Sequence, residues 1–468
     1  MKKHPLLCIL LPLFVVFFFA CRKNSFINSA NALVQFSADT LYFDTVFVST
    51  GSITEFVKII NANDQKLRLS SIRLMGGSQS YFHINVDGSP GPEQDNVDLD
   101  AGDSLYIFVA VQIDPQTADL PFVVQDSIQI AFNGNKRYVQ LEAYGQNAHF
   151  LRDQVLTGST TWDNKLPYVI LGGLQVDTNA LLTIPAGCKV YFHADAPLLV
   201  DGTLLVNGDH YDSTRVSFQG DRLDAPYSGY PGSWPGIYFR TTSTGNDLKY
   251  AVIRNADQSV VVQAPPSGAV PKVLLEQCIV DNGYTAGIIG VQGSLQANNC
   301  LISNCGQNIL LGGGGSYLFS QCTAAAYSNN YLSHTQPVLT VADIIQQGTA
   351  LETGDLQASF NNCIFWGANG TVDNEVVISK QGSGVFNVSF SGGLWKEKTA
   401  PGGITSTGII ANQDPLFDSV NNSALFYNFR LQAASPAIGA GMPTAIGIDL
   451  DGNPRPAVNP DLGCYQRQ

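Results

Sequence analysis

Charged and aromatic residues that could bind a sugar gather in one stretch, residues 219–236, with the sequence QGDRLDAPYSGYPGSWPG. The candidate ligand-binding side chains are Asp221, Arg222, Asp224, Tyr227, Tyr230 and Trp234. Aromatic rings stack on the apolar faces of sugars, while carboxylates and guanidinium groups form oriented hydrogen bonds with hydroxyls. The stretch therefore predicts a glycan-binding loop. The alternative is that Trp234 and Pro235 pack the loop onto the protein surface.

A second group of oxygen-bearing side chains occurs in the segment IDLDGNPRPAVNPDLGCY. Asp449, Asp451 and Asn453 stand at alternate positions, as calcium ligands do in a tight loop. The bidentate Glu that completes a calcium-binding helix–loop–helix is missing. We therefore favour a hydrogen-bonded cap in which Arg455 pairs with an Asp, and keep calcium as the alternative.

Histidine and cysteine spacing predicts neither a metal site nor an activated nucleophile. The histidines after residue 20 are His83, His149, His193, His210 and His334, and they form no metal pair and no Ser-His-Asp order. Seven cysteines follow Cys21, an odd number that is poor material for a disulfide framework. We predict no cofactor, apart from the open question of calcium.

The elements that must position these residues are indicated by a repeating cysteine. Cys278, Cys300 and Cys322 are 22 residues apart, and Cys363 follows 41 residues later. Each ends a short apolar strand after an amide or polar residue, in LEQC, QANNC, LFSQC and SFNNC. A step near 22 residues with β-rich content is typical of a solenoid whose stacked turns lie about 4.8 Å apart. The cysteines are then buried apolar side chains on an inner ladder, although a bridge between neighbouring rungs stays open.

The same step continues upstream and into the turns. Leu174 to Leu198 and Leu182 to Leu204 repeat it, and we also align Val190, Val216 and Ile237 and place Ala251 opposite Cys278. Asn255, Asn282 and Asn304 each lie four residues past a ladder position. Asn tolerates left-handed geometry, which predicts stacked asparagine turns. We predict a right-handed parallel β-helix over residues 150–445, with a cap over 446–468 and VADIIQQG as a short helix.

The part before the solenoid predicts a separate domain. Residues 34–147 contain seven short alternating strands with Gly, Asn and Asp turns, the count of an immunoglobulin-like β-sandwich. Residues 21–33 are expected to be a polar tether. The fold class is therefore all-β: an immunoglobulin-like sandwich followed by a parallel β-helix.

The first 20 residues predict export. Lys2, Lys3 and His4 precede an apolar run over residues 6–19, which is short for a membrane span and normal for a signal peptide. Ala20-Cys21 resembles a bacterial lipobox, with Phe18 where Leu is usual, and implies cleavage before Cys21 and lipidation of its thiol. An ordinary signal peptide is the alternative.

Charge limits the partners. The formal net charge of −13 becomes −15 without Lys2 and Lys3, and this argues against nucleic acid and polyanion binding.

Several motifs resemble those of the pectin-lyase-like β-helix superfamily, and more closely the β-helix lipoproteins of Bacteroidetes. They are LLTIPAGCKVYF, LLVDGTLLVNG, SWPGIYF, NDLKYAVIRNA and the ending DPLF…NFRLQAASPAIGAG…IDLDGNPRP…PDLGCY. The superfamily mixes lyases, hydrolases, adhesins and inert scaffolds, so the resemblance implies a fold but no single activity. Hydrolases of the polygalacturonase type carry NTD, DD, GHG and RxK motifs, and this sequence has no GHG, no adjacent Asp pair and no matching RxK. A lyase-type site implies a basic residue beside acidic ones, for which Arg240, Lys249 and Arg254 are the candidates.

Two functions follow from these observations. The favoured one is a non-catalytic, lipid-anchored protein of the outer membrane that binds a glycan or an envelope protein. The alternative is a polysaccharide lyase or glycoside hydrolase, for which an open groove with three or more carboxylates beside an Arg or Lys would be required. Arg22 and Lys23 replace the acidic residues usual after the lipidated cysteine of surface-exported lipoproteins, so the periplasmic and cell-surface faces both stay open.

Overall fold

The computed structural model describes residues 25–47, 53–113, 122–265, 271–347 and 350–468. The predicted signal peptide and Cys21 lie outside these ranges. The chain divides into two compact units, Met1–Asn147 and Ala148–Gln468. The described residues include no helix long and apolar enough to cross a membrane. Apart from two short 3-10 turns, η2 (Gly77–Gln79) and η3 (Tyr227–Gly229), the regular elements described are strands, so the all-β class is confirmed.

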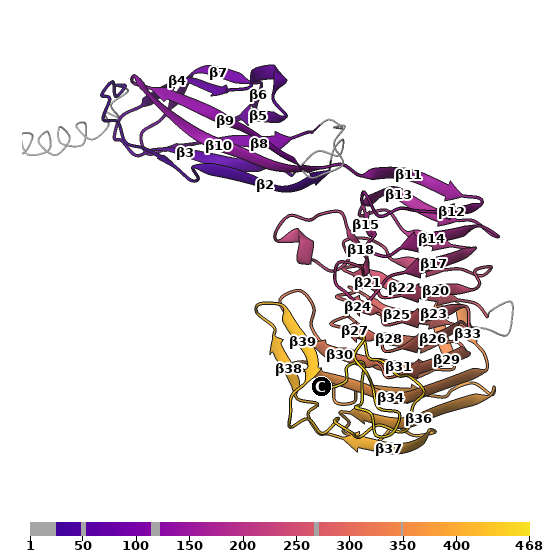
Figure 1. Cartoon of the computed structure of the whole chain (residues 1–468). Coiled ribbons are helices and arrows are strands. Elements are labelled where there is room, and N and C mark those ends of the chain that lie inside the picture. The colour runs from indigo at the N-terminus through magenta and orange to yellow at the C-terminus, as the bar shows by residue number, and fades with distance from the viewer. Residues whose placement is uncertain (1–24, 48–52, 114–121, 266–270, 348–349) are drawn as a thin grey trace, which may run out of the picture. The chain divides into compact units, whose positions relative to one another are not determined.

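The first unit contains two five-stranded sheets (Figure 1). One has the order β1 (Val34–Phe36), β3 (Glu55–Asn61), β8 (Ser104–Val111), β5 (Phe82–Val86), β6 (Ser89–Pro90). The other has the order β2 (Thr40–Phe47), β10 (Asn135–Gln146), β9 (Phe122–Phe132), β4 (Leu67–Leu74), β7 (Glu93–Leu99). Phe43 and Phe82 meet between the sheets, with ring centroids 5.7 Å apart. The immunoglobulin-like type stays a prediction.

Residues 25–33, expected to be part of a tether, lie along this unit. Ile27 N donates to Lys66 O at 2.8 Å, and Asn133 Nδ2 donates to Ile27 O at 2.9 Å. The Arg68 guanidinium lies over the ring of Phe26. The short polar segment is thus bound to the sandwich through its own backbone groups, which bond to a carbonyl and to a side-chain amide of the sandwich.

The second unit is a parallel β-helix with three strands per coil (Figure 1). Its first face stacks β12 (Ser159–Thr161), β14 (Leu181–Pro185), β17 (Thr203–Asn207), β20 (Asn246–Lys249), β23 (Val273–Glu276), β26 (Ser294–Asn298) and β29 (Gly315–Ser320). The second stacks β15 (Lys189–Phe192), β18 (Val216–Gly220), β21 (Ala251–Arg254), β24 (Ile279–Asp281), β27 (Leu301–Ser303) and β30 (Thr323–Tyr327). The third stacks β16 (Leu198–Val200), β19 (Ile237–Phe239), β22 (Gln258–Gln263), β25 (Ala286–Val291), β28 (Ile309–Gly312), β31 (Leu339–Ala342) and β35 (Val376–Ser379).

Longer strands begin and end the coil. They are β11 (His149–Leu156), β13 (Tyr168–Val176), β34 (Leu356–Ala368), β36 (Phe386–Trp395) and β37 (Thr405–Ala411). Two antiparallel hairpins project from it: β32 (Ile344–Gln347) with β33 (Ala350–Thr353), and β38 (Phe417–Asn421) with β39 (Phe426–Leu431). The short helix predicted for VADIIQQG is wrong, because its described residues, rich in β-branched side chains, belong to two strands: the end of β31, which pairs with β28 and β35, and β32, which pairs with β33.

Strand registers test the predicted repeat. Leu174 pairs with Leu198 and Leu182 with Leu204, as predicted. Val190 instead pairs with Phe218, and Ile237 lies on the third face opposite Leu198. An alternating pattern looks the same after a shift of two residues, so it cannot separate Val216 from Phe218 as the partner.

The cysteine ladder fills the interior of the coil. Cys278, Cys300, Cys322 and Cys363 are buried and free. The residue before each has positive φ: Gln277, Asn299, Gln321 and Asn362 at 50°, 50°, 56° and 54°. Burial raises the pKa of the Cys300 thiol well above its usual range. The four cysteines are therefore small, buried side chains of the coil core, as predicted.

The asparagine turns are also confirmed. Asn255, Asn282 and Asn304 have φ values of 61°, 57° and 51°, and each follows a strand of the second face. Asn282 Nδ2 donates to Asn255 Oδ1 at 2.9 Å, which links neighbouring coils through their turns.

The last 27 residues do not end the coil as a cap but run along its side. We call residues 442–468 the C-terminal strap. Asn362 Nδ2 donates to Met442 O at 2.8 Å, Asn299 Nδ2 to Ile448 O at 2.7 Å, and Arg215 Nη2 to Leu450 O at 2.9 Å. Apolar residues of the strap and outward residues of the second face form a second core. The strap contributes Leu450, Leu462, Cys464 and Tyr465, and the coil contributes Leu301, Ala325 and Ile364. The strap therefore packs against several coils at once.

Candidate functional site

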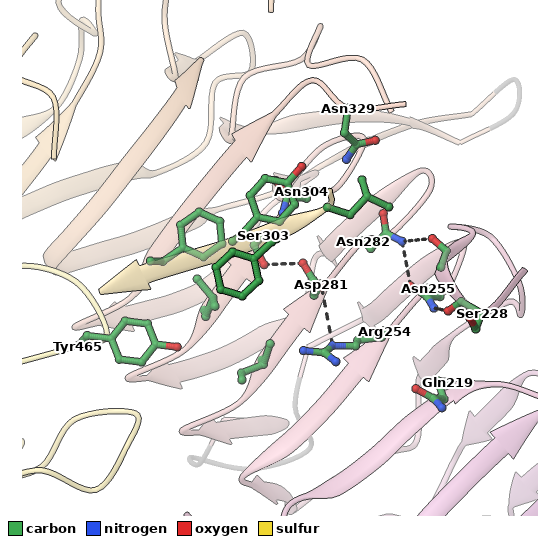
Figure 2. Close-up of a pocket in the computed structure, with 17 residues that line it drawn as sticks. Gln219, Ser228, Arg254, Asn255, Asp281, Asn282, Ser303, Asn304, Asn329 and Tyr465 are labelled. Carbon is green, nitrogen blue, oxygen red and sulfur yellow. Dashed lines mark hydrogen bonds and ion pairs between the residues drawn. The ribbon is translucent and has the colours of Figure 1, made fainter. Parts of the chain in front are cut away.

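A cleft of about 460 Å³ lies on the second face of the β-helix (Figure 2). Its lining comes from five successive coils, from Gln219 on β18 to Asn329 after β30, from the turn around η3, and from the hairpin β38–β39 with the strap. The lining residues are Gln219, Ser228, Gly229, Arg254, Asn255, Ile279, Asp281, Asn282, Leu301, Ser303, Asn304, Asn329, Leu425, Phe426, Tyr427, Phe429 and Tyr465.

The charged part of the floor follows from strand alternation. Inward residues of β21, β24 and β27 fill the core, so the alternate positions face outward. The parallel register sets Arg254 beside Asp281 and Asp281 beside Ser303. Arg254 Nε lies 3.7 Å from Asp281 Oδ2, and Ser303 Oγ donates to Asp281 Oδ1 at 2.7 Å. The carboxylate is thereby compensated on both sides (Figure 2).

The asparagine turns form the other part of the floor. Asn255 Nδ2 donates to Ser228 O at 2.8 Å, and Asn282 Nδ2 donates to Gly229 O at 3.0 Å. These bonds hold the η3 turn against the coil as one wall of the cleft (Figure 2). Asn304, on the next coil, also lines the cleft, and the residue is only 4% exposed.

The opposite wall is aromatic. Phe426 is 59% exposed, and Tyr427 stacks on Phe429 with centroids 5.9 Å apart. Arg430 Nε donates to Asp451 Oδ2 at 2.8 Å and its guanidinium lies over the ring of Tyr465. The hairpin is thus fixed to the strap, and its aromatic side borders the polar floor.

The predicted loop contributes Gln219, Ser228 and Gly229 to the cleft, but its charged residues lie outside the lining and are already paired. Arg222 donates to Asp224 through two bonds, at 2.7 and 2.8 Å, and this hydrogen bonding lowers the pKa of Asp224. His193 Nδ1 lies 2.8 Å from Asp221 Oδ2, while burial raises the pKa of Asp221 against the opposing effect of His193. Arg222 also lies over the ring of Tyr227. None of these three charged residues lines the cleft.

Two aromatic residues of the loop stay partly exposed. Tyr227 is 43% exposed and Tyr230 is 36% exposed. Their centroids are 5.2 Å apart, and Tyr230 lies 4.9 Å from the ring of Tyr331. Ser228 and Gly229, between them in sequence, line the cleft, so the tyrosines stand at its rim.

The assignment of Trp234 to ligand binding is wrong, and the packing alternative holds for it. Trp234 is 1% exposed and stacks on Phe192 with centroids 4.2 Å apart. Its Nε1 donates to Arg254 O at 2.9 Å. A large ring with one satisfied donor is well suited to the core, and no face is left for a sugar.

The three basic catalytic candidates are not brought together. Arg240, Lys249 and Arg254 follow or end β19, β20 and β21, which lie on three different faces. Arg240 Nε donates to Asp201 Oδ1 at 2.9 Å, and Lys249 Nζ lies 3.1 Å from Glu276 Oε2. Only Arg254 lines the cleft.

The candidate calcium ligands serve the strap. Asp449 accepts N–H donors from Asp451, Asn453 and Gln466 at 2.8–2.9 Å. These N–H groups point at the carboxylate of Asp449 from the positions that a bound cation would take. The carboxylate of Asp451 is paired with Arg430 instead. Among the described residues, no group of three His, Cys, Asp or Glu side chains is placed to hold a metal.

Arg455 stabilises the strap differently from the prediction. It donates to Asp461 O and Gly463 O and to Gln321 Oε1, rather than to an Asp carboxylate.

The site also contains residues that sequence reasoning missed. They are Asp281, Ser303, Asn304, Phe426, Tyr427 and Tyr465. The signal that could have found the wall is the aromatic run ALFYNF at residues 424–429, where exposed and half-buried rings follow a tight turn. The sequence analysis also missed a buried pair outside the cleft, in which His334 Nε2 lies 2.9 Å from Glu375 Oε1.

Comparison of the sequence with known families and with curated proteins gives no match. Among solved structures, a protein of unknown function from Porphyromonas gingivalis W83 is 16% identical over 27% of this chain and 50% of that chain, with a TM-score of 0.19. The chain thus spans half the length of that protein. The Agl-KA catalytic domain is 9% identical over 75% and 72% of the two chains, with a TM-score of 0.28. The catalytic unit of the GH87 alpha-1,3-glucanase from Streptomyces thermodiastaticus strain HF3-3 is 8% identical over 80% and 91%, with a TM-score of 0.22. Similarities of this size define neither a family nor an activity.

Proposed function

We propose that this protein is a non-catalytic, lipid-anchored protein of the outer membrane that binds a glycan in the cleft on the second face. The observation that carries the proposal is the pairing of an exposed aromatic wall, with Phe426 59% exposed, and a floor of amide and hydroxyl groups. Apolar sugar faces stack on such rings while their hydroxyls bond to such a floor. Tyr227 and Tyr230 extend the aromatic surface at the rim.

Binding is better supported than catalysis in this cleft. Glycoside hydrolysis generally uses a pair of carboxylates flanking the scissile bond. Asp281 is the one carboxylate among the lining residues, and Ser303 and Arg254 already hold it. The groove with three or more carboxylates, which would favour a lyase or hydrolase, is therefore not this one.

We expect Phe426→Ala to weaken glycan binding about 10-fold, because the ring lost is exposed and stacks on the ligand rather than on the core. Thermal stability should stay nearly unchanged. The measurement is a glycan array with the soluble chain lacking residues 1–20, followed by calorimetric titration of the bound glycan. Tyr211→Ala is the matched control, since Tyr211 is 62% exposed and does not line the cleft. Equal affinity of both variants would remove the aromatic wall as the site.

We expect Cys21→Ala to release the protein from the membrane fraction, because the lipid would be attached through this thiol. The measurement is partition of the full chain, expressed in a bacterium with a lipoprotein pathway, between detergent and aqueous phases. Cys8→Ala, in the apolar run of the signal, is the control that keeps the lipobox. A Cys21→Ala protein that still enters the detergent phase would contradict the anchor.

A further inference from the structure

The side chain of Asn304 differs from the other two asparagines of the cleft floor. Asn255 and Asn282 have the same turn conformation and donate to backbone and amide acceptors of the protein. Asn304 is 4% exposed, yet its Oδ1 has no hydrogen-bond partner in the fold. The side-chain amides of Asn255 and Asn282 are therefore hydrogen-bonded to each other, whereas Oδ1 of Asn304 on the next coil accepts no such bond.

An unpartnered amide in this position is unfavourable for the fold. A buried polar atom without a partner has given up its water and gained nothing in return. Nearly all such atoms in folded proteins are paired, so each exception calls for an explanation. Asn304 lines the cleft, and a molecule bound there can supply the missing partner.

The chemistry of the lining restricts what that molecule is. A primary amide ends in one acceptor and one donor group side by side. Two hydroxyls on adjacent carbons of a sugar ring match this pair, because each hydroxyl can donate or accept. The formal charges lining the cleft are those of Arg254 and Asp281, which lie 3.7 Å apart and cancel each other. A neutral lining of this kind offers no net attraction to an acidic ligand.

We propose, on the basis of the glycan-binding function above, that the cleft takes a neutral saccharide and that Asn304 holds two adjacent free hydroxyls of one sugar ring. In the bound state the side chain turns so that Oδ1, buried and unpartnered in the fold alone, reaches the cleft and accepts from one hydroxyl, while Nδ2 donates to the other. The ring is then bordered by the aromatic wall around Phe426. Asn304 is thus the residue that selects saccharides with an adjacent hydroxyl pair.

The first arm of the test needs no ligand and compares Asn304→Gly with Asn282→Gly by thermal unfolding. Both positions have positive φ, 51° and 57°, so glycine relieves the backbone equally at each. Asn282→Gly removes bonds to Gly229 O and Asn255 Oδ1 and should lower the Tm by several degrees. Asn304→Gly removes no bond within the protein and should leave the Tm unchanged or raise it. An equal fall in both variants would overturn the inference.

The second arm measures binding to xylan, mannan, curdlan and polygalacturonate. Xylan and mannan carry adjacent free hydroxyls along the chain, whereas the linkage of curdlan leaves none inside it. Polygalacturonate carries the adjacent pair together with a carboxylate. We expect xylan or mannan to bind, curdlan and polygalacturonate not to bind, and Asn304→Gly to weaken binding at least 10-fold. Periodate oxidation, which cleaves the bond between adjacent hydroxyl-bearing carbons, should abolish binding of the native protein.

The outcomes separate this inference from the proposed function. Curdlan or polygalacturonate bound as tightly as xylan, or unchanged affinity of Asn304→Gly, overturns the role of Asn304 and leaves glycan binding standing. A folded native protein that binds none of the four polysaccharides and no glycan of the array overturns both.

Discussion

Trp234→Ala should lower the free energy of unfolding by about 3–5 kcal/mol, the range for removing a large aromatic side chain from a core. Trp234 is 1% exposed and stacks on Phe192 with an interplanar angle of 12°. The truncation leaves a cavity between coils and removes the donor to Arg254 O. The measurement is denaturant unfolding followed by circular dichroism.

The neighbouring Tyr230 provides the control for this prediction. Tyr230 is 36% exposed, so Tyr230→Ala should change the free energy of unfolding by less than about 1 kcal/mol. Because Trp234 also supports the backbone at Arg254, glycan binding should fall in Trp234→Ala even at temperatures where the protein is folded. Equal stability of the two variants would show that Trp234 does not belong to the core.

Cys300→Asp should destabilise the protein by at least about 4 kcal/mol, because it places a carboxylate in the coil interior with no basic partner. Cys300 is fully buried between Cys278 and Cys322. Cys300→Ala leaves a small cavity and should cost only about 1 kcal/mol. The difference between the two variants, measured by denaturant unfolding, isolates the effect of the charge.

The pH dependence of Cys300→Asp gives a second check. Burial would raise the folded-state pKa of the introduced carboxyl above its unfolded value. The variant should therefore recover stability as the pH falls and the carboxyl becomes neutral, and lose it as the pH rises. Rapid alkylation of Cys300 in the native protein would contradict its buried position.

The repeat could be predicted from the sequence because equivalent positions of successive coils have the same environment and therefore carry similar residues. The cysteine step, the left-handed asparagine turns and the registers of Leu174 and Leu182 follow from local patterns of this kind. The equivalence of Val190 and Val216 failed because β-alternation has a period of two and fixes the face but not the partner.

The cleft could not be predicted, because it joins residues that are far apart in the chain. Asp281 and Ser303 belong to the coil, whereas Phe426 and Tyr465 come from a hairpin and a strap that fold back on it. No local pattern states where such a segment docks. The sequence predicts the wrong role for Trp234 for a related reason: its neighbours are polar, Gly and Pro residues typical of an exposed loop, whereas its contact with Phe192 is set by the tertiary fold.

The strap also changes how the coil can be expected to unfold. In a plain solenoid each repeat touches only its neighbours, so terminal repeats can open one at a time. Here residues 442–464 bind Arg215, Asn299, Thr323 and Asn362, which belong to four coils between β18 and β34. Opening any of these coils breaks contacts with a segment that the others share. We therefore expect the coils from β18 to β34 to unfold as one cooperative unit, and the docking of the strap, which forms contacts far apart in sequence, to slow folding.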